Sequence, residues 1–242
     1  MKTFDELVEG IKELKKRGFI KAHRSDDTGI GKTLEDELGI EENNIQGPDG
    51  EDTEVKGARK NSSSMLTLFT KSPSPRGINS KLRKVYGYTD EDFAPKLCLH
   101  TTITSTEFNK QGFKIIGKKD RIELASNKQQ TKIPDLQIPY WTKETLEKAI
   151  KAKYKDSLLY VKAEHRGSGK EEEFHFVEAY HLQGLSFEKF STNLSEGILK
   201  VDIRLGFYDS GKNKGKPHDH GTAFRINPSF LDLIFSKRKR VA

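Results

Sequence analysis

The sequence predicts an α/β or α+β fold with mixed β-sheets. Segments whose apolar residues recur at helical spacing are interspersed with segments whose apolar residues alternate, as in half-buried strands. The two kinds of segment do not follow one another in strict strand–helix–strand order, which argues against a doubly wound parallel sheet. With 242 residues, the chain can bury a substantial core as one large domain or as two lobes.

The first half of the chain opens with a helix. Its apolar residues are spaced for one face of a helix between Thr3, a suitable N-cap, and Gly18, which would end it. A second, short helix is expected from Thr33 to Leu38, before Gly39. The strands expected next are 53–57, 65–70, 97–104, 113–116 and 121–125, with a helix over 79–86 between the second and third.

The second half continues the mixture. A helix is expected to open at Thr142, and a last helix to begin near Pro228. The expected elements are a helix over 142–153, strands 157–163 and 173–180, a helix over 187–193, and strands 199–206 and 222–226.

Composition favours a polyanionic partner. The chain has 43 Lys and Arg against 36 Asp and Glu, a formal net charge of +7. The single cysteine, Cys98, excludes an internal disulfide framework and a multi-cysteine zinc site. No apolar stretch approaches the ~20 residues of a membrane-spanning helix, and the first residues lead into an amphipathic helix rather than a secretory signal. We therefore expect a cytoplasmic protein.

The most informative spacing lies at residues 47–56. Asp49 stands in a Pro-Asp-Gly turn before the strand that carries Glu54 and Lys56. Side chains two residues apart on a strand share a face, so Glu54 and Lys56 point the same way and Asp49 can curl back toward them. Two carboxylates that bind Mg²⁺ and a cation that handles the attacking water are what hydrolysis of a phosphodiester requires. A solvated charged strand is the alternative.

Glu35 is a third carboxylate for this group, and alone it would be an ordinary surface glutamate. It follows Gly29-Ile30-Gly31-Lys32-Thr33, which matches half of a P-loop. The first glycine of that motif and the preceding apolar strand are both missing, which argues against nucleotide binding.

Two further segments suit a polyanion. Lys71 and Arg76 lie with hydroxyl and amide side chains on a loop before a helix, where phosphate contacts are common. Asp202 and Arg204 alternate on one face of a strand, and Arg225 lies on the next, so all three can reach base edges.

Between those strands lies a basic, glycine-rich loop that suits backbone phosphates. Its lysines are Lys212, Lys214 and Lys216, and His218 and His220 follow as candidates for base contacts. A metal site at His218, Asp219 and His220 is an alternative, although adjacent ligands without a distant partner are poor metal-ligand spacing. A solvated loop is another.

Together these segments resemble the MvaI/BcnI family of type II restriction endonucleases, which belong to the PD-(D/E)XK nucleases and are related to the mismatch-repair nicking enzyme MutH. The resemblance spans residues 28–227. It is carried by the Gly-x-Gly-Lys-Thr-Leu-Glu segment, Pro-Asp with Glu-Val-Lys, Leu-Phe-Thr-Lys-Ser-Pro at 68–73, and Asp-His-Gly-Thr-Ala-Phe-Arg at 219–225. Residues of about 105–195 match only in their general pattern.

The resemblance implies a mixed-sheet restriction-endonuclease-like core in a two-lobe DNA clamp. The catalytic lobe would contain about residues 1–90 and parts of the C-terminal half, while the bounds of the second lobe stay open. Asp49 and Glu54 would bind Mg²⁺, Lys56 would handle the water, and Glu35 would support the metal site. Such enzymes act as monomers in prokaryotes, beside a DNA methyltransferase that acts on the same site.

The implied activity is Mg²⁺-dependent cleavage of double-stranded DNA at a short pseudo-palindrome, CC(A/T)GG or CC(G/C)GG, with one strand cut per binding event. Two alternatives remain. A MutH-like nickase would need a partner for activation, and a non-catalytic DNA-binding module would not need the Asp49, Glu54 and Lys56 triplet.

Overall fold

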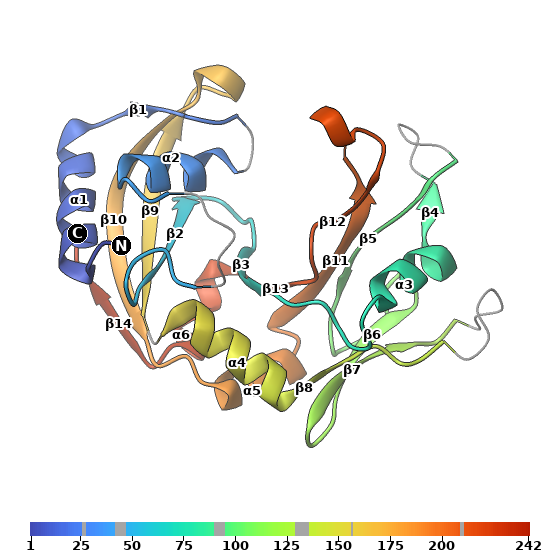
Figure 1. Ribbon diagram of the computed structural model, residues 1–242. Coiled ribbons are helices and arrows are strands. Elements are labelled where there is room, and N and C mark those ends of the chain that lie inside the picture. The colour runs from blue at the N-terminus through green and yellow to red at the C-terminus, as the bar shows by residue number, and fades with distance from the viewer. Residues whose placement is uncertain (26–27, 42–46, 90–94, 129–135, 156, 209–210) are drawn as a thin grey trace. The chain divides into compact units, whose positions relative to one another are not determined.

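The computed structural model describes residues 1–25, 28–41, 47–89, 95–128, 136–155, 157–208 and 211–242 (Figure 1). The chain divides into two compact units, each built from segments distant in sequence. Unit 1 comprises Met1–Ser64, Ile150–Ser186 and Leu231–Ala242, and unit 2 comprises Met65–Ala149 and Phe187–Phe230. The mixed α/β fold that the sequence predicted is confirmed.

Unit 1 is a sheet with two helices packed against one of its faces. The strand order is β1-β10-β9-β2, and β14 pairs with the other half of β10. The β2 and β9 strands are parallel, whereas the pairs that β10 makes are antiparallel. Its elements are α1 (Phe4–Arg17), β1 (Ile20–Lys21), α2 (Gly29–Glu37), β2 (Glu54–Arg59), β9 (Leu158–Arg166), η2 (Gly169–Glu171), β10 (Glu173–Gln183), α6 (Leu231–Ile234) and β14 (Lys237–Arg240).

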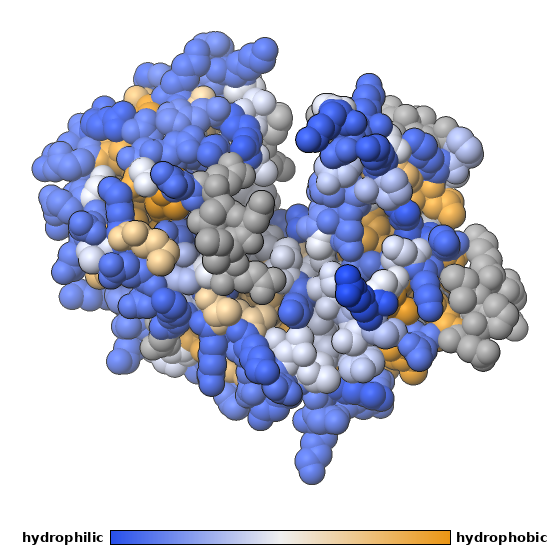
Figure 2. All heavy atoms as spheres, viewed as in Figure 1, coloured by the Kyte–Doolittle hydropathy of each residue, from blue (hydrophilic) through white to orange (hydrophobic). Residues whose placement is uncertain are grey.

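Helix α1 shows why the sequence folds this way locally. Thr3 and Glu6 form a reciprocal capping box, and Gly18 ends the helix at a positive φ of 79°. Leu7, Ile11 and other buried residues of α1 pack in one hydrophobic cluster with residues of α2 and one face of the sheet. The outward side of α1 is mostly hydrophilic, as the left of Figure 2 shows. Burial of this apolar face holds the two helices against β2, β9 and β10.

Unit 2 contains two sheets. The larger has the order β3-β13-β11-β5-β4, with β12 paired to β11, and the smaller has the order β6-β7-β8. Its elements are β3 (Leu66–Thr70), α3 (Ile78–Tyr86), β4 (Tyr88–Thr89), β5 (Leu97–Ile103), β6 (Phe113–Gly117), β7 (Arg121–Ser126), β8 (Tyr140–Thr142), α5 (Phe187–Ser195), β11 (Leu199–Phe207), η3 (Gly211–Asn213), β12 (Pro217–Asp219), β13 (Ala223–Ile226) and η4 (Pro228–Phe230). Helix α4 (Lys143–Tyr154) begins in unit 2, and its residues from Ile150 onward belong to unit 1.

Alternation along β11 sets the two faces of the larger sheet. Val201, Ile203 and Leu205 are buried apolar residues, and the polar Asp202 and Arg204 alternate with them. Phe69, Phe190 and Phe224 stack in the core on the buried side, with ring centroids 4.9–5.6 Å apart. One face of β11 is therefore fixed in the core, and its polar residues share the other face.

Several expected elements differ at their ends or in kind. Helix α2 begins at Gly29 rather than Thr33, because the buried Thr33 hydroxyl donates to the carbonyl of Gly29, 2.8 Å away, within the helix. The last helix is a short α6 preceded by the 3₁₀ turn η4. Strand β14 was not expected, because its run of four basic residues has no apolar alternation. Among the described residues, no helix is long and apolar enough to cross a membrane.

Candidate functional site

Glu54 and Lys56 lie side by side on β2. The strand pairs in parallel with β9, and the register sets Glu54 opposite Leu158 and Lys56 opposite Tyr160. Val55, between them, points into the core cluster of unit 1. The alternation therefore places both charged side chains on the other face, where the ammonium of Lys56 contacts Glu54 Oε1.

Asp49 is folded back onto the same strand. Its Oδ2 accepts a hydrogen bond from the backbone N–H of Val55 over 2.9 Å. The intervening turn is closed by Gly50, whose N–H donates to the Thr53 carbonyl at 2.9 Å. A Cβ on Gly50 would lie 2.8 Å from the Lys2 carbonyl oxygen, so this tight turn requires glycine. The three residues of the predicted triplet are thus brought together.

The electrostatics of the pair follow from burial. The Glu54 side chain is completely buried, and loss of solvent raises its pKa, while Lys56 opposes that rise and Asp49 adds to it. Burial disfavours the charge on Lys56, but Glu54, Asp49 and Glu35 outweigh it and raise the pKa of the lysine. The raised pKa favours the ammonium form of Lys56, which is a cation and a hydrogen-bond donor.

Lys153 is a member of this cluster that sequence reasoning missed. It lies near the end of α4, with Nζ 2.9 Å from Glu54 Oε1, and it donates a hydrogen bond to the Gly47 carbonyl over 3.2 Å. The stretch Lys151-Ala152-Lys153-Tyr154-Lys155 contains three lysines, and nothing in the sequence distinguishes one of them from the others. Only the tertiary fold selects this one.

Glu35, on α2, acts on the site through its charge, which contributes to the raised pKa of Lys56. The neighbouring Gly-Lys-Thr segment does not form a phosphate loop. Thr33 Oγ1 accepts a hydrogen bond from the His23 N–H at 3.0 Å, and Lys32 pairs with Asp36 at 2.8 Å. Both side chains are engaged in contacts within unit 1.

The carboxylates fit a hard divalent cation. Glu54 Oε2 is buried and has no hydrogen-bond partner among the described residues, which is costly unless a ligand completes it. Asp49, its neighbour, is held in place by one backbone amide. The described part of the chain contains no cluster of three or more His, Cys, Asp or Glu side chains with metal-binding geometry. Mg²⁺ needs only one or two carboxylates, because water and substrate phosphates complete its shell.

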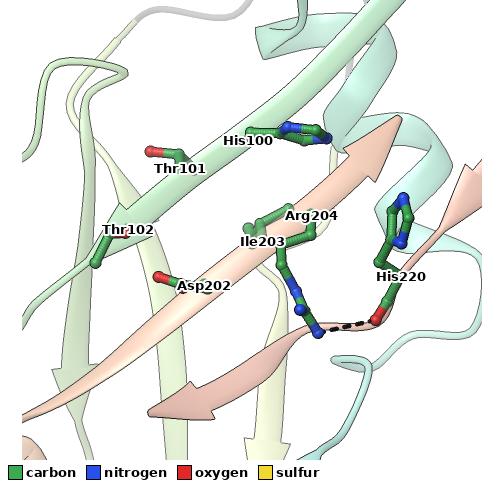
Figure 3. Close-up of a pocket in the computed structure, with 7 residues that line it drawn as sticks. All are labelled: His100, Thr101, Thr102, Asp202, Ile203, Arg204 and His220. Atoms are coloured by element: carbon green, nitrogen blue, oxygen red, sulfur yellow. Dashed lines mark hydrogen bonds between the residues drawn. The ribbon is translucent and has the colours of Figure 1, made fainter. Parts of the chain in front are cut away.

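In unit 2, a pocket of about 460 Å³ opens on the polar face of the larger sheet (Figure 3). Strands β11 and β5 pair there, with Asp202 opposite Thr102 and Arg204 opposite His100. Residues opposite one another in a sheet share a face, so these four side chains line one surface. The described residues that line the pocket are His100, Thr101, Thr102, Asp202, Ile203, Arg204 and His220.

Asp202 and Arg225 form an ion pair in this surface. Arg225 Nη1 donates to Asp202 Oδ2 at 2.6 Å, and its Nη2 donates to the Met65 carbonyl at 2.7 Å. The carboxylate is buried, and its Oδ1 has no hydrogen-bond partner among the described residues. Two of the Arg225 nitrogens are thus engaged within unit 2, and Asp202 retains one acceptor.

Arg204 is held beside them. Its Nη2 donates to the backbone carbonyl of His220 over 3.0 Å (Figure 3), while its buried Nε has no partner in the described residues. Burial and the nearby positive charge of Arg225 lower the pKa of Arg204 below the ordinary arginine value. The guanidinium nevertheless stays charged, as arginines in proteins do. The pocket therefore contains both an unfilled acceptor and an unfilled donor.

The two histidines after the basic loop pack as rings in contact with one another. His218 stacks on Tyr208 with ring centroids 3.9 Å apart, and the ring of His220 lies tilted beside His218 at 3.8 Å. The Asp219 carboxylate accepts from Asn79 Nδ2 at 2.9 Å and from the Gly221 N–H at 2.8 Å. This arrangement disfavours the alternative of a metal site at these three residues. Burial, followed by the charges of His218 and Arg204, lowers the pKa of His220.

The remaining predicted DNA contacts lie at the surface of unit 2. Lys71, before α3, is half-buried, and its carbonyl accepts a hydrogen bond from Trp141 Nε1 at 2.8 Å. Lys216 Nζ donates to Asn213 Oδ1 at 3.2 Å. The exposed members are Arg76, Lys212, Lys214 and Lys216.

His100, Thr102 and Tyr208 are surface residues that sequence reasoning missed. Strand β5 was expected, but nothing in its sequence indicates that it pairs with β11 in the register that sets His100 beside Arg204. Gly206 accommodates this neighbour, since a Cβ there would lie 3.0 Å from His100 Nε2. The absence of a side chain at Gly206 was the one available signal.

Comparisons with known proteins agree on one family. The model of the MvaI/BcnI restriction endonuclease family matches residues 8–235. A solved structure of the restriction endonuclease MvaI with its cognate DNA substrate is similar over the full length of both chains, with 34% identity and a TM-score of 0.88. MvaI in the absence of DNA matches over the same full lengths, with 34% identity and a TM-score of 0.55. No curated protein sequence matches this chain significantly.

Proposed function

Because this chain belongs to the MvaI/BcnI restriction endonuclease family, we propose that it hydrolyses double-stranded DNA in a Mg²⁺-dependent reaction at a short pseudo-palindromic site, one strand per binding event. The family makes the chain a site-specific deoxyribonuclease, and DNA is its partner. The metal, the site and the mode of cleavage are the parts that we propose.

The observation that carries the proposal is the convergence of Asp49, Glu54 and Lys56. A solvated charged strand would leave its carboxylates in water, yet Glu54 is completely buried and its Oε2 has no hydrogen-bond partner among the described residues. Keeping a buried acceptor unfilled destabilises the fold, so function is the simplest reason for it. Within unit 1, these three residues supply the carboxylates and the cation that hydrolysis of a phosphodiester requires.

Asp49 and Glu54 would hold the metal, with Glu35 as a supporting charge. A bound Mg²⁺ would supply Lewis acidity toward a phosphoryl oxygen and lower the pKa of a water. Lys56, kept protonated by its carboxylate neighbours, can donate a hydrogen bond to the attacking oxygen and orient it. The Val55 N–H keeps Asp49 in position at 2.9 Å while this happens.

Recognition belongs to the polar face of unit 2. The unfilled acceptor of Asp202 suits the exocyclic amino group of cytosine or adenine, and Arg204 offers a donor for guanine. His218, His220 and Arg225 complete the surface, and the exposed lysines of 212–216, with Lys71 and Arg76, suit phosphates. The sites CC(A/T)GG and CC(G/C)GG come from the family resemblance rather than from this geometry.

Among the described residues, we find one cluster of this kind, at Asp49, Glu54 and Lys56, and this supports cleavage of one strand at a time by a monomer. A DNA methyltransferase of the same specificity is the partner that such an enzyme requires in its host, and we include it in the proposal. The test is digestion of a supercoiled plasmid of known sequence with Mg²⁺, followed by mapping of the ends. We expect a nicked intermediate and then ends at one short sequence. Cleavage at random positions, or none at any Mg²⁺ concentration, would contradict the proposal.

A further inference from the structure

Two ammonium groups converge on a single oxygen of the catalytic carboxylate. Lys56 contacts Glu54 Oε1, and Lys153 Nζ lies 2.9 Å from the same atom. The other oxygen, Oε2, has no hydrogen-bond partner among the described residues. Lys56 is accounted for by the chemistry of the attacking water, whereas Lys153 lies outside the Asp…Glu-x-Lys pattern and has no role in that account.

Lys153 is placed to act on both carboxylate-bearing segments. Its second contact, a hydrogen bond of 3.2 Å to the Gly47 carbonyl, ties α4 to the turn that carries Asp49. Its side chain is only 28% exposed, so its charge acts in a partly desolvated environment. Charges in such an environment interact far more strongly than they would in bulk water.

The balance of charge at the site defines what this ammonium does. The negative groups that act on Lys56 are Glu54, Asp49 and Glu35, and the positive groups are Lys56 itself and Lys153. Lys153 therefore adds a second positive charge directly beside the carboxylate that would bind the metal. A divalent cation would add further positive charge at the same place, and a DNA phosphate that arrives with it would offset part of that charge.

We propose that Lys153 is a positioning residue that stabilises the empty carboxylate site and weakens its affinity for a divalent cation until a DNA phosphate is present. The ammonium fixes Glu54 through Oε1 and leaves Oε2 toward the metal, and its positive charge opposes the approach of a second cation. This inference rests on the proposed function. It makes metal binding and DNA binding mutually dependent, since each supplies charge that the other lacks.

The decisive variants are Lys153→Gln and a matched control. Glutamine retains a hydrogen-bond donor but removes the charge, so the contact with Gly47 can persist. Lys151→Gln removes an identical charge from the exposed side of the same helix. Glu54→Gln removes the charge of the proposed metal ligand, so it defines the background level of Ca²⁺ binding elsewhere on the protein. All variants are made in the full-length protein.

The measurement is calorimetric titration of each protein with Ca²⁺ in the absence of DNA, accompanied by thermal unfolding without metal. We expect Lys153→Gln to bind Ca²⁺ at least ~10-fold more tightly than the wild type, as loss of a nearby positive charge requires. The same variant should unfold at a lower temperature when no metal is present, and Lys151→Gln should match the wild type in both respects.

An affinity for Ca²⁺ that is unchanged or weaker in Lys153→Gln, or no detectable binding by that variant, would overturn the inference. A gain that Lys151→Gln shares would also overturn it, because the effect would then be a general one of net charge. Mg²⁺-dependent cleavage by the wild type is scored separately. A wild type that cuts DNA while Lys153→Gln shows no gain refutes only the role of Lys153.

Discussion

Arg225 Nη1 donates to Asp202 Oδ2 over 2.6 Å, across neighbouring strands of the polar face in unit 2. The pair leaves Asp202 Oδ1 buried and without a hydrogen-bond partner in the described residues. The arginine thus fixes the orientation of the carboxylate, and the remaining oxygen is available to a ligand.

Asp202→Asn should weaken binding of the cognate site more than binding of random DNA. The substitution replaces an acceptor with an amide and breaks the charge of the pair, so discrimination at one base pair should fall by roughly 1–3 kcal/mol. Binding of cognate and single-mismatch duplexes by the variant would measure this. Equal losses on cognate and random DNA would show that Asp202 only supports the fold.

Arg225→Ala is expected to cost stability as well as recognition. It removes the hydrogen bonds that Arg225 donates to the buried Asp202 carboxylate and to the Met65 carbonyl, which should lower the free energy of unfolding by about 3–5 kcal/mol. Urea denaturation of the variant gives this value. The double variant Arg225→Ala/Asp202→Ala serves as the control, because removal of both charges should recover part of the loss. A single variant as stable as the wild type would contradict the buried pair.

His220 predicts a dependence of stability on pH. Burial, His218 and Arg204 lower its pKa in the folded protein below 6.5, so the unfolded chain binds the proton more readily. The free energy of unfolding should therefore fall as the pH decreases through 6.5 toward the lowered value. Near pH 7 and above, where both states are neutral, the contribution is fully present.

The difference between the wild type and His220→Gln isolates this contribution from the other histidines. The variant should lose part of the pH dependence between about pH 6.5 and the lower pKa. Chemical denaturation of both proteins at a series of pH values provides the comparison. Parallel curves across that window would mean that His220 is not destabilised as an imidazolium.

Substitution of Lys214 should change the salt dependence of DNA binding rather than its specificity. It is exposed on the turn after η3, where a flexible cation suits a phosphate. Lys214→Ala should weaken the binding of cognate and of random DNA to similar extents. It should also flatten the slope of log affinity against log salt concentration by about one phosphate contact. Arg204→Ala offers the contrast, since its loss should fall mainly on the cognate site. A specific loss from Lys214→Ala would assign it to base readout instead.

The local parts of this site could be predicted from the sequence, and the parts that depend on strand pairing could not. Asp49, Glu54 and Lys56 stand within one turn and one strand, so alternation alone brings them together. Helix α1 was predictable for the same reason, because its cap and its apolar face are read within a few residues. Such features need no knowledge of the tertiary fold.

Lys153 and His100 are residues whose place in the site depends on strand pairing and could not be predicted from the sequence. Lys153 reaches Glu54 only because α4 precedes β9, the parallel neighbour of β2. His100 lies beside Arg204 only because β5 joins β11 in one particular register. The sequence contains many lysines and seven histidines, and nothing local distinguishes these two. Pairing of distant strands is decided by packing of the whole sheet, which spacing along the chain does not reveal.

Glu54 and Asp49 form the metal-dependent catalytic centre that we propose, and Glu54→Gln is the sharpest test of that assignment. The substitution preserves the shape of the side chain and removes its charge. Cleavage of cognate DNA under single-turnover conditions with Mg²⁺, measured together with DNA affinity, is the experiment. We expect the variant to cleave cognate DNA at least ~10³-fold more slowly than the wild type, while its affinity for the cognate site is largely retained. A rate close to that of the wild type would place the catalytic centre elsewhere in the chain.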